Sequence, residues 1–289
     1  MQARQIVWLL KETYRNWSDD NASRMAAALA YYAAFALAPL MIVVIEIGAF
    51  LLGGNGHHHV VRDAMLQYLR PSLGDAGTKA VGDLVQATFN QRNHGLFATI
   101  VGYAIFIAAA TGLFIAIEGM LDAVWHVDAR TTGIAATLRA RAKTLALIAG
   151  IAVVLLLSLL ANAGLSALSG ALAAASPVGH AAASVATPLL SFFVVSVGFA
   201  ALFKYLPKTA VAWKDVVVGA AMTGALFIIG QYLIGLYLGR ISTGSTFGAA
   251  GTFVAILLWL YYSGQIFLFG AEFTKVFATS QGSKSKRSA

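Results

Sequence analysis

Six long apolar stretches, separated by polar segments, dominate the pattern of the chain. They cover residues about 29–52, 96–117, 144–168, 184–206, 214–238 and 247–274. A helix needs roughly 20 mainly apolar residues to cross the hydrocarbon core of a bilayer. None of the stretches alternates as a barrel strand does, and lipid cannot satisfy exposed backbone groups, so each is predicted to be a helix. The predicted fold class is therefore all-α, a polytopic transmembrane helical bundle with six spans.

The segments between and beside the spans have their own helical periodicity. Residues 1–28 begin with an amphipathic stretch, which predicts an interfacial helix and lead-in on the cytoplasmic leaflet. Their charged character, and the long span that follows, are unlike a cleavable signal peptide. The segment 53–95 has apolar positions at helical spacing on both sides of residues 71–77, which predicts two short external helices. Residues 29–278 thus form the transmembrane domain, and the polar tail 279–289 is predicted to be disordered.

Composition and charge support a chain that faces lipid. Apolar residues make up 59% and charged residues 11%, whereas a soluble domain has about 25% charged residues. Fifteen of the 20 Lys and Arg residues fall in segments that are cytoplasmic if both termini lie inside, so the N-terminus and C-terminus are predicted to be cytoplasmic. The net charge of +8 is attributed to this bias, and no nucleic-acid partner is expected. The absence of cysteine excludes disulfides, thiolate metal sites and cysteine nucleophiles.

Ionisable residues inside membrane spans are costly, which makes each of them a candidate for function. Glu46 lies late in the first span, surrounded by aliphatic residues and seven positions after Pro39. Proline removes one helical hydrogen bond and loosens the helix around it. A protonatable or cation-binding role for Glu46 and a purely structural role both remain open.

The last span carries a better organised polar stripe. Its members recur at intervals of 4, 3, 4 and 3 residues, which places them in one narrow sector of a helix: Tyr261, Gln265, Leu268, Glu272 and Lys275. Such a stripe must face other helices or a wet cavity. It is either a hydrogen-bonded seam between helices, with Glu272 and Lys275 as an ion pair, or a face that contacts substrate or couples transport to an ion.

The second span ends in a similar arrangement of Thr111, Glu118 and Asp122. The two carboxylates lie at the predicted cytoplasmic end of the span. Simple solvation by water explains them there, and a role in substrate contact or coupling is the alternative.

Small residues predict where helices pack closely. Gly224 and Gly235 share one side of the fifth span, and Gly235 and Gly239 form a GxxxG pair. The stretch 239–251, which includes Gly248 and Gly251, predicts a tight re-entrant turn packed on the fifth span. An anion site at its free amides is the other interpretation, although it matches no phosphate-binding motif.

No cofactor or metal site is predicted. Residues 57–59 are three consecutive histidines, which point in three directions on a helix and therefore make a poor site for one metal ion. The motifs of zinc peptidases and of nucleophile elbows are absent.

Four blocks of the chain together resemble the YihY/virulence factor BrkB family of bacterial inner-membrane proteins. They are YYAAFALAPLMIVV (31–44), AIEGMLDAVWHVDAR (116–130), KYLPKTAVAWKDVVVGA (204–220) and FGAAGTFVAILLWLYYSGQIFLFGAEFTKVFA (247–278). The resemblance implies a multi-pass protein of the bacterial cell inner membrane and supplies no settled catalytic or binding residues. It also implies that the former family label, ribonuclease BN, is a misassignment, and the chain has no soluble catalytic domain that would support that label. Glu46 departs from the family pattern, which weakens it as a general coupling site.

Two classes of function compete. The first is a transporter or flippase for a lipid-related or amphipathic solute in envelope maintenance, with membrane lipids or a small organic substrate as partners. The alternative is a non-catalytic membrane scaffold or envelope assembly factor, in which glycine seams serve homo-oligomerisation. An enzyme is not expected, because only the neighbourhoods of Glu118/Asp122 and Lys204/Lys208 offer candidate groups for a membrane-embedded active site.

Overall fold

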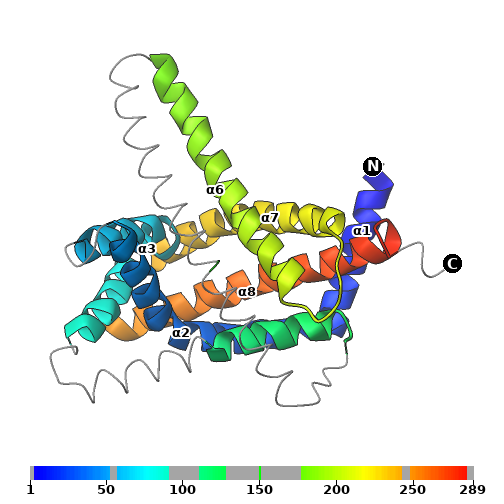
Figure 1. Ribbon diagram of the computed structural model, residues 1–289, viewed down its shortest axis with the longest axis horizontal. Helices are drawn as coiled ribbons and strands as arrows, with labels where there is room; N and C mark the ends of the chain where they lie inside the picture. Colours follow the sequence, from blue (N-terminus) through cyan, green and yellow to red (C-terminus); the bar gives the residue numbers. More distant parts are fainter. Residues whose placement is uncertain are drawn as a thin grey trace.

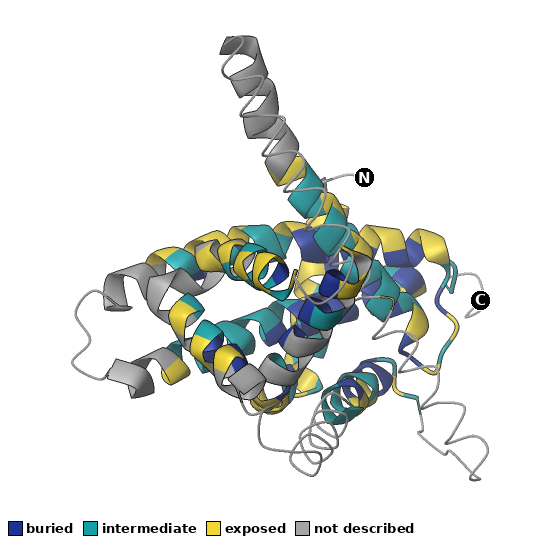
Figure 2. Ribbon diagram, turned by 60° about the vertical axis from the view of Figure 1, so that its left-hand side comes forward, coloured by how far each residue is buried: buried dark blue, intermediate teal, exposed yellow. Residues whose placement is uncertain are grey.

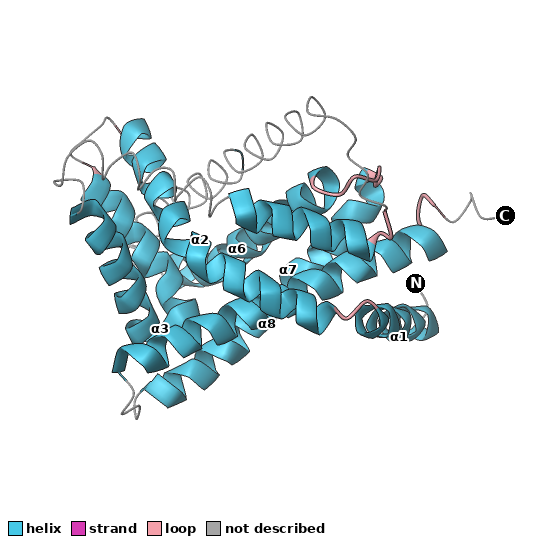
Figure 3. Cartoon of the chain, turned by 90° about the horizontal axis from the view of Figure 1, so that it is seen from below, coloured by secondary structure: helices cyan, strands magenta, loops and turns pink. Residues whose placement is uncertain are grey.

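The computed structural model describes residues 3–52, 57–90, 111–127, 177–242 and 248–284, together with residue 150. Every regular element in these ranges is a helix, with no strand among them (Figure 3). Three stretches in these ranges are long and apolar enough to cross a membrane: Pro188–Tyr205, Trp213–Leu236 and Phe253–Ser280. The all-helical membrane class is thereby confirmed. The predicted span 144–168 and most of the span 96–117 lie outside the described residues.

Within the described ranges the main helices are α1 (Ala3–Asp19), α2 (Ala22–Leu51), α3 (His58–Asn90), α6 (Pro177–Tyr205), α7 (Trp213–Ser242) and α8 (Gly248–Ser280). A further helical segment covers residues 111–124. The central helix is α8, which contacts α1, α2, α3 and α7, while α6 packs on α7 (Figure 1). Figure 1 shows α3 at one end of the bundle and both chain termini toward the other.

Paired glycines and threonines let α7 and α8 approach closely. A Cβ added at Gly219 would lie 1.9 Å from Thr274 Oγ1, and one added at Gly270 would lie 1.9 Å from Thr223 Oγ1. Each threonine hydroxyl donates a 2.7 Å hydrogen bond to the carbonyl oxygen of the glycine one turn earlier on its own helix. The seam is therefore reciprocal, as antiparallel helices require, and it buries no unsatisfied hydroxyl.

The glycines and the proline that the sequence singled out are placed as follows. Gly224 of α7 faces α6, where an added Cβ would lie 2.3 Å from Ser196 Oγ. Pro39 lies within the continuous helix α2. Gly235 and Gly239 are helical residues of α7, and the remaining two, Gly248 and Gly251, form the first turn of α8. The predicted re-entrant turn is thus helical at both of its ends, and residues 243–247 between them lie outside the described residues.

The N-terminal helix α1 lies against the last part of α8. Leu9 and Thr13 are buried, and Leu9 packs with Phe273 and Val276. The remaining apolar surface of α1 is exposed at Ile6, Val7, Trp8, Leu10 and Tyr14. Exposed aromatic and aliphatic side chains beside basic ones are typical of a helix that lies at a membrane interface.

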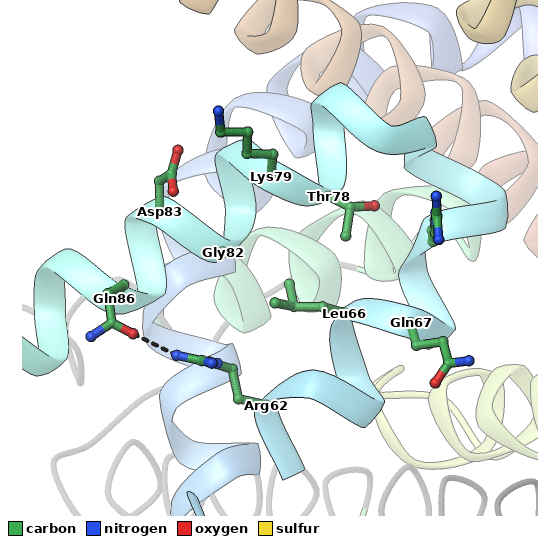
Figure 4. A pocket seen from close by; sticks show the side chains of 9 residues that line it. Arg62, Leu66, Gln67, Thr78, Lys79, Gly82, Asp83 and Gln86 are labelled. Carbon is green, nitrogen blue, oxygen red and sulfur yellow. Dashed lines mark hydrogen bonds between the residues drawn. The ribbon is translucent and has the colours of Figure 1, made fainter. Parts of the chain in front are cut away.

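Helix α3 folds back on itself at the opposite end. Arg62 donates a hydrogen bond to the side-chain oxygen of Gln86, although a straight helix would separate the two positions by about 36 Å. The backbone is helical throughout His58–Asn90, so the chain reverses while it remains helical. Two antiparallel legs result, and they correspond in position to the two helices predicted on either side of residues 71–77 (Figure 4).

Candidate functional site

The first polar cluster joins α8 to the turn between α1 and α2. Lys275 Nζ lies 3.3 Å from Glu272 Oε2 and 3.4 Å from Asp20 Oδ2. Glu272 is fully buried, and the side chain of Lys275 is 12% exposed. His126 completes the cluster, with its Nε2 3.1 Å from Asp20 Oδ1. Three segments that are distant in sequence, at Asp20, at His126 and at Glu272 with Lys275, thus meet in one cluster.

Two residues with left-handed backbone conformation shape the turns that bring this cluster together. Asn21, between α1 and α2, has a φ of 53°, and His126, just after the segment 111–124, has a φ of 50°. Asparagine and histidine are among the residues that adopt this region most readily after glycine. The amide of His126 donates to the carbonyl of Ala123, which ends the helical segment and turns the imidazole toward Asp20.

The second cluster has the same composition, one lysine between two carboxylates. Lys208 Nζ lies 3.0 Å from Glu118 Oε1 and 3.0 Å from Asp122 Oδ2. The backbone amide of Lys208 also donates a 2.8 Å hydrogen bond to Asp122 Oδ1. Asp122 is only 2% exposed. Solvation by water, the simpler interpretation from the sequence, was therefore wrong for Asp122, because the loop between α6 and α7 folds over it and supplies the cation.

A third contact fastens the end of α8 to the same region. Asp215 is buried near the start of α7 and accepts hydrogen bonds from the backbone amide and the hydroxyl of Ser283. Lys284 Nζ lies 4.4 Å above the ring of Trp125 and donates to Thr209. The residues directly after α8 are thus attached to the loop that carries Lys208.

Burial and charge act in opposite directions on Asp20 and Lys208, two titratable groups that lie outside the spans. Burial alone would raise the pKa of Asp20, but hydrogen bonding with Glu272 and His126 and the charge of Lys275 hold it below its ordinary value. Burial alone would lower the pKa of Lys208, but its contacts with Glu118 and Asp122 raise it.

The other residues of the predicted stripe extend from the first cluster along α8. Leu268 is fully buried, and Tyr261 and Gln265 are partly buried. Among the described residues, Gln265 Oε1 and Glu272 Oε1 are both buried without a hydrogen-bond donor. The stripe therefore faces other parts of the protein, and the predicted ion pair between Glu272 and Lys275 is present.

Two predicted residues lie apart from these clusters. Thr111 is partly buried, two turns before Glu118 in the same helical segment. Glu46 is partly buried near the far end of α2, beside the apolar cluster that contacts α3. The 26 residues between Asp20 and Glu46 correspond to about 39 Å of helix, so Glu46 does not belong to the site around Glu272.

Sequence reasoning missed the roles of Asp20, His126 and Asp215. Asp20 lies in a run of polar residues, Ser18 to Asn21, that is indistinguishable from a solvated turn. Within the described ranges, no group of three or more His, Asp or Glu residues is arranged to hold a metal ion.

Comparison with known proteins identifies the family. The model of the virulence factor BrkB family matches residues 13–289. The chain belongs to this family. Among BrkB relatives, a UPF0761 membrane protein of Rhodospirillum centenum is 28% identical over 93% of this chain and 57% of its own length. Another, from Methylibium petroleiphilum, is 29% identical over 93% of this chain and 65% of its own length.

A third relative, from Verminephrobacter eiseniae, is 27% identical over 92% of this chain and 60% of its own length. The chain thus spans about three fifths of the length of these BrkB relatives, all of which are named membrane proteins. No solved structure matches it.

Proposed function

We propose that this BrkB-family chain is a transporter- or flippase-like protein that moves a lipid-related or amphipathic solute, with Glu272 as the coupling residue. The proposal includes six spans, cytoplasmic termini and a location in the bacterial inner membrane. It includes no catalytic step and therefore no ribonuclease activity.

The observation that carries the proposal is the buried polar face of α8. Glu272 is fully buried within a helix that is long and apolar enough to span a membrane. An ionisable group at membrane depth is expensive, and such groups typically mark substrate or proton pathways. A buried polar atom without a hydrogen-bond donor costs about 1–3 kcal/mol. Gln265 Oε1 and Glu272 Oε1 are both in this state among the described residues, and both lie on the same face of α8.

The charge balance around Glu272 favours coupling to a proton or cation. The cluster at Lys275 contains two carboxyl groups for one lysine, and so does the cluster at Lys208. With all carboxylates ionised and His126 neutral, each lysine leaves one negative charge unbalanced. A protonation event at Asp20 or Glu272 changes the charge that holds Lys275, and therefore the attachment of the α1–α2 turn to α8.

The test is lipid movement in proteoliposomes that contain the full chain. We expect the wild type to accelerate the transbilayer movement of fluorescent phosphatidylglycerol, measured by dithionite quenching, and we expect an imposed pH gradient to change the rate. Glu272→Gln preserves shape but cannot ionise, so most of the acceleration and all of the pH response should be lost. Asp19→Asn is the control, because Asp19 is exposed and adjacent to the cluster without belonging to it.

Two results would count against the proposal. If the wild type moves lipid no faster than empty vesicles do, the carrier function fails for this lipid class. If Glu272→Gln keeps the full pH response, Glu272 is not the coupling residue. Native mass spectrometry distinguishes a carrier for another lipid class from a scaffold. A carrier should retain a stoichiometric lipid or solute that Glu272→Gln loses, whereas a scaffold should retain only loosely bound bulk lipid that Glu272→Gln leaves unchanged.

A further inference from the structure

A cleft of about 680 Å³, lined in part by charged side chains, lies between the two legs of α3. Its walls come from one leg at Arg62, Leu66, Gln67 and Arg70, and from the other at Thr78, Lys79, Gly82, Asp83 and Gln86. Figure 4 shows Leu66 pointing between the legs, and Arg62 reaching across to Gln86. The volume falls within the range of about 300–1,000 Å³ that is usual for small-ligand sites.

Close approach of the legs fixes the width of this cleft. A Cβ added at Gly82 would meet Leu66 Cδ1 at 3.3 Å, so glycine allows the second leg to lie directly on the first. Arg62 is held in place by the side-chain oxygen of Gln86 and by Asp63, whose Oδ1 lies 2.9 Å from its Nε. A guanidinium that is positioned in this way loses less conformational freedom when it binds a ligand.

The chemistry of the lining selects an anion. Three lining residues are cationic, namely Arg62, Arg70 and Lys79, and one, Asp83, is anionic. Asp63, just outside the lining, pairs with Arg62, so Arg70 and Lys79 carry most of the positive charge that a ligand meets. Gln67 and Thr78 add neutral hydrogen-bonding groups to the same walls. Guanidinium and ammonium donors around a small cleft match the oxygens of a phosphate group, which accept several charge-assisted hydrogen bonds at once.

The position of the cleft favours a phosphate that belongs to a lipid. The other side of the legs buries Val61, Val81 and Val85 against Met41 of α2 and Ile256 of α8. These contacts fix α3 to one end of two apolar helices, α2 and α8. Figure 2 shows buried residues where the helices of the bundle meet and exposed residues on their outer faces. The end of a membrane-spanning helix lies at the level of the lipid headgroups. An anionic headgroup at that level can enter the cleft while its acyl chains remain in the bilayer.

We propose that the cleft between the legs of α3 binds the phosphate-bearing headgroup of an anionic membrane lipid. This proposal does not depend on the proposed transport, because the cleft lies at the opposite end of the bundle from Glu272. Binding can also be measured without flux, so the failure of either proposal leaves the other to be judged separately.

The test is competitive native mass spectrometry on the full chain in detergent, with equimolar dioleoyl-phosphatidylglycerol and dioleoyl-phosphatidylcholine. These lipids share acyl chains and differ in headgroup charge. We expect a preference for phosphatidylglycerol of about tenfold in the wild type, since several charge-assisted contacts act together. Lys79→Gln should reduce that preference about threefold, and the double variant R62Q/K79Q should abolish it.

Lys214→Gln is the matched control. Lys214 is exposed at the start of α7, at the other end of the bundle, and its substitution changes the net charge by the same amount. The preference should stay at the wild-type value in this variant. Lys79 is also exposed, so its substitution is not expected to disturb folding, and a melting curve for each variant verifies this.

Three outcomes would overturn the inference. Equal binding of the two lipids by the wild type would exclude headgroup selection. An equal loss in Lys79→Gln and Lys214→Gln would assign the preference to net charge. Full displacement of phosphatidylglycerol by millimolar inorganic phosphate, together with phosphate adducts that R62Q/K79Q removes, would assign the cleft to free phosphate.

Discussion

Replacement of Lys208 by methionine should leave Asp122 as an uncompensated buried charge. In the folded protein Lys208 Nζ lies 3.0 Å from both Glu118 and Asp122. Methionine keeps the length of the apolar stem and removes the ammonium group. Glu118 is partly exposed and can regain water, but Asp122, with 3% of its side chain exposed, cannot.

The size of the effect follows from the geometry. At 3.0 Å and an effective dielectric constant near 20, one such contact corresponds to about 5 kcal/mol of Coulomb energy before desolvation. Desolvation of the carboxylates offsets much of this, and the lysine side chain is 33% exposed, so water screens it further. The backbone amide of Lys208, 2.8 Å from Asp122 Oδ1, remains in the variant. We therefore expect a net loss of stability of about 1–3 kcal/mol.

Thermal unfolding in detergent, followed by tryptophan fluorescence, measures this loss. Lys208→Met should lower Tm by several degrees, and Lys214→Met, which removes an exposed lysine from the same region, should not. Adding Asp122→Asn to Lys208→Met removes the stranded charge and should restore part of the loss. An unchanged Tm in Lys208→Met, or effects that simply add in the double variant, would refute the assignment of Lys208 as the partner of a buried carboxylate.

Two further variants probe the α1–α2 turn and the seam between α7 and α8. Asp20→Asn should lower Tm at neutral pH relative to Asp19→Asn. The partners of Asp20 lower its pKa in the folded protein. The carboxylate therefore contributes fully to the free energy of unfolding above about pH 3.8, and this contribution disappears as the pH falls through the folded pKa of Asp20. A Tm difference that already vanishes near pH 6 would contradict this. Gly270→Ala should destabilise by about 1–3 kcal/mol, since its Cβ would lie 1.9 Å from Thr223 Oγ1. Gly198→Ala, whose Cβ meets no described atom within 4 Å, should be neutral or slightly stabilising, and an equal cost at both glycines would refute close packing at the seam.

The sequence predicted helix positions well where apolar character alone decides them. The predicted spans about 214–238 and 247–274 correspond to α7 (Trp213–Ser242) and α8 (Gly248–Ser280). Both helices continue past the predicted C-terminal ends, because a hydropathy pattern detects the part that crosses lipid and not the turns that continue into polar surroundings. For α8, the additional turn carries the residues that lead to Ser283.

The partners of the polar residues could not be predicted from the apolar pattern. Helical spacing placed Glu272 and Lys275 on one face and predicted their ion pair, because both lie on one helix. Asp20 is separated from Lys275 by 255 positions, and periodicity holds no information on which helix ends meet. Glu118, Asp122 and Lys208 show the same limit, since each was identified as a candidate group but the loop that joins them is placed only by packing. The number of acidic and basic residues near the span ends nevertheless indicates which residues can pair. Acidic residues near the predicted ends of spans require a cation at that level of the membrane, and Lys208 and Lys275 are among the few that the chain supplies there.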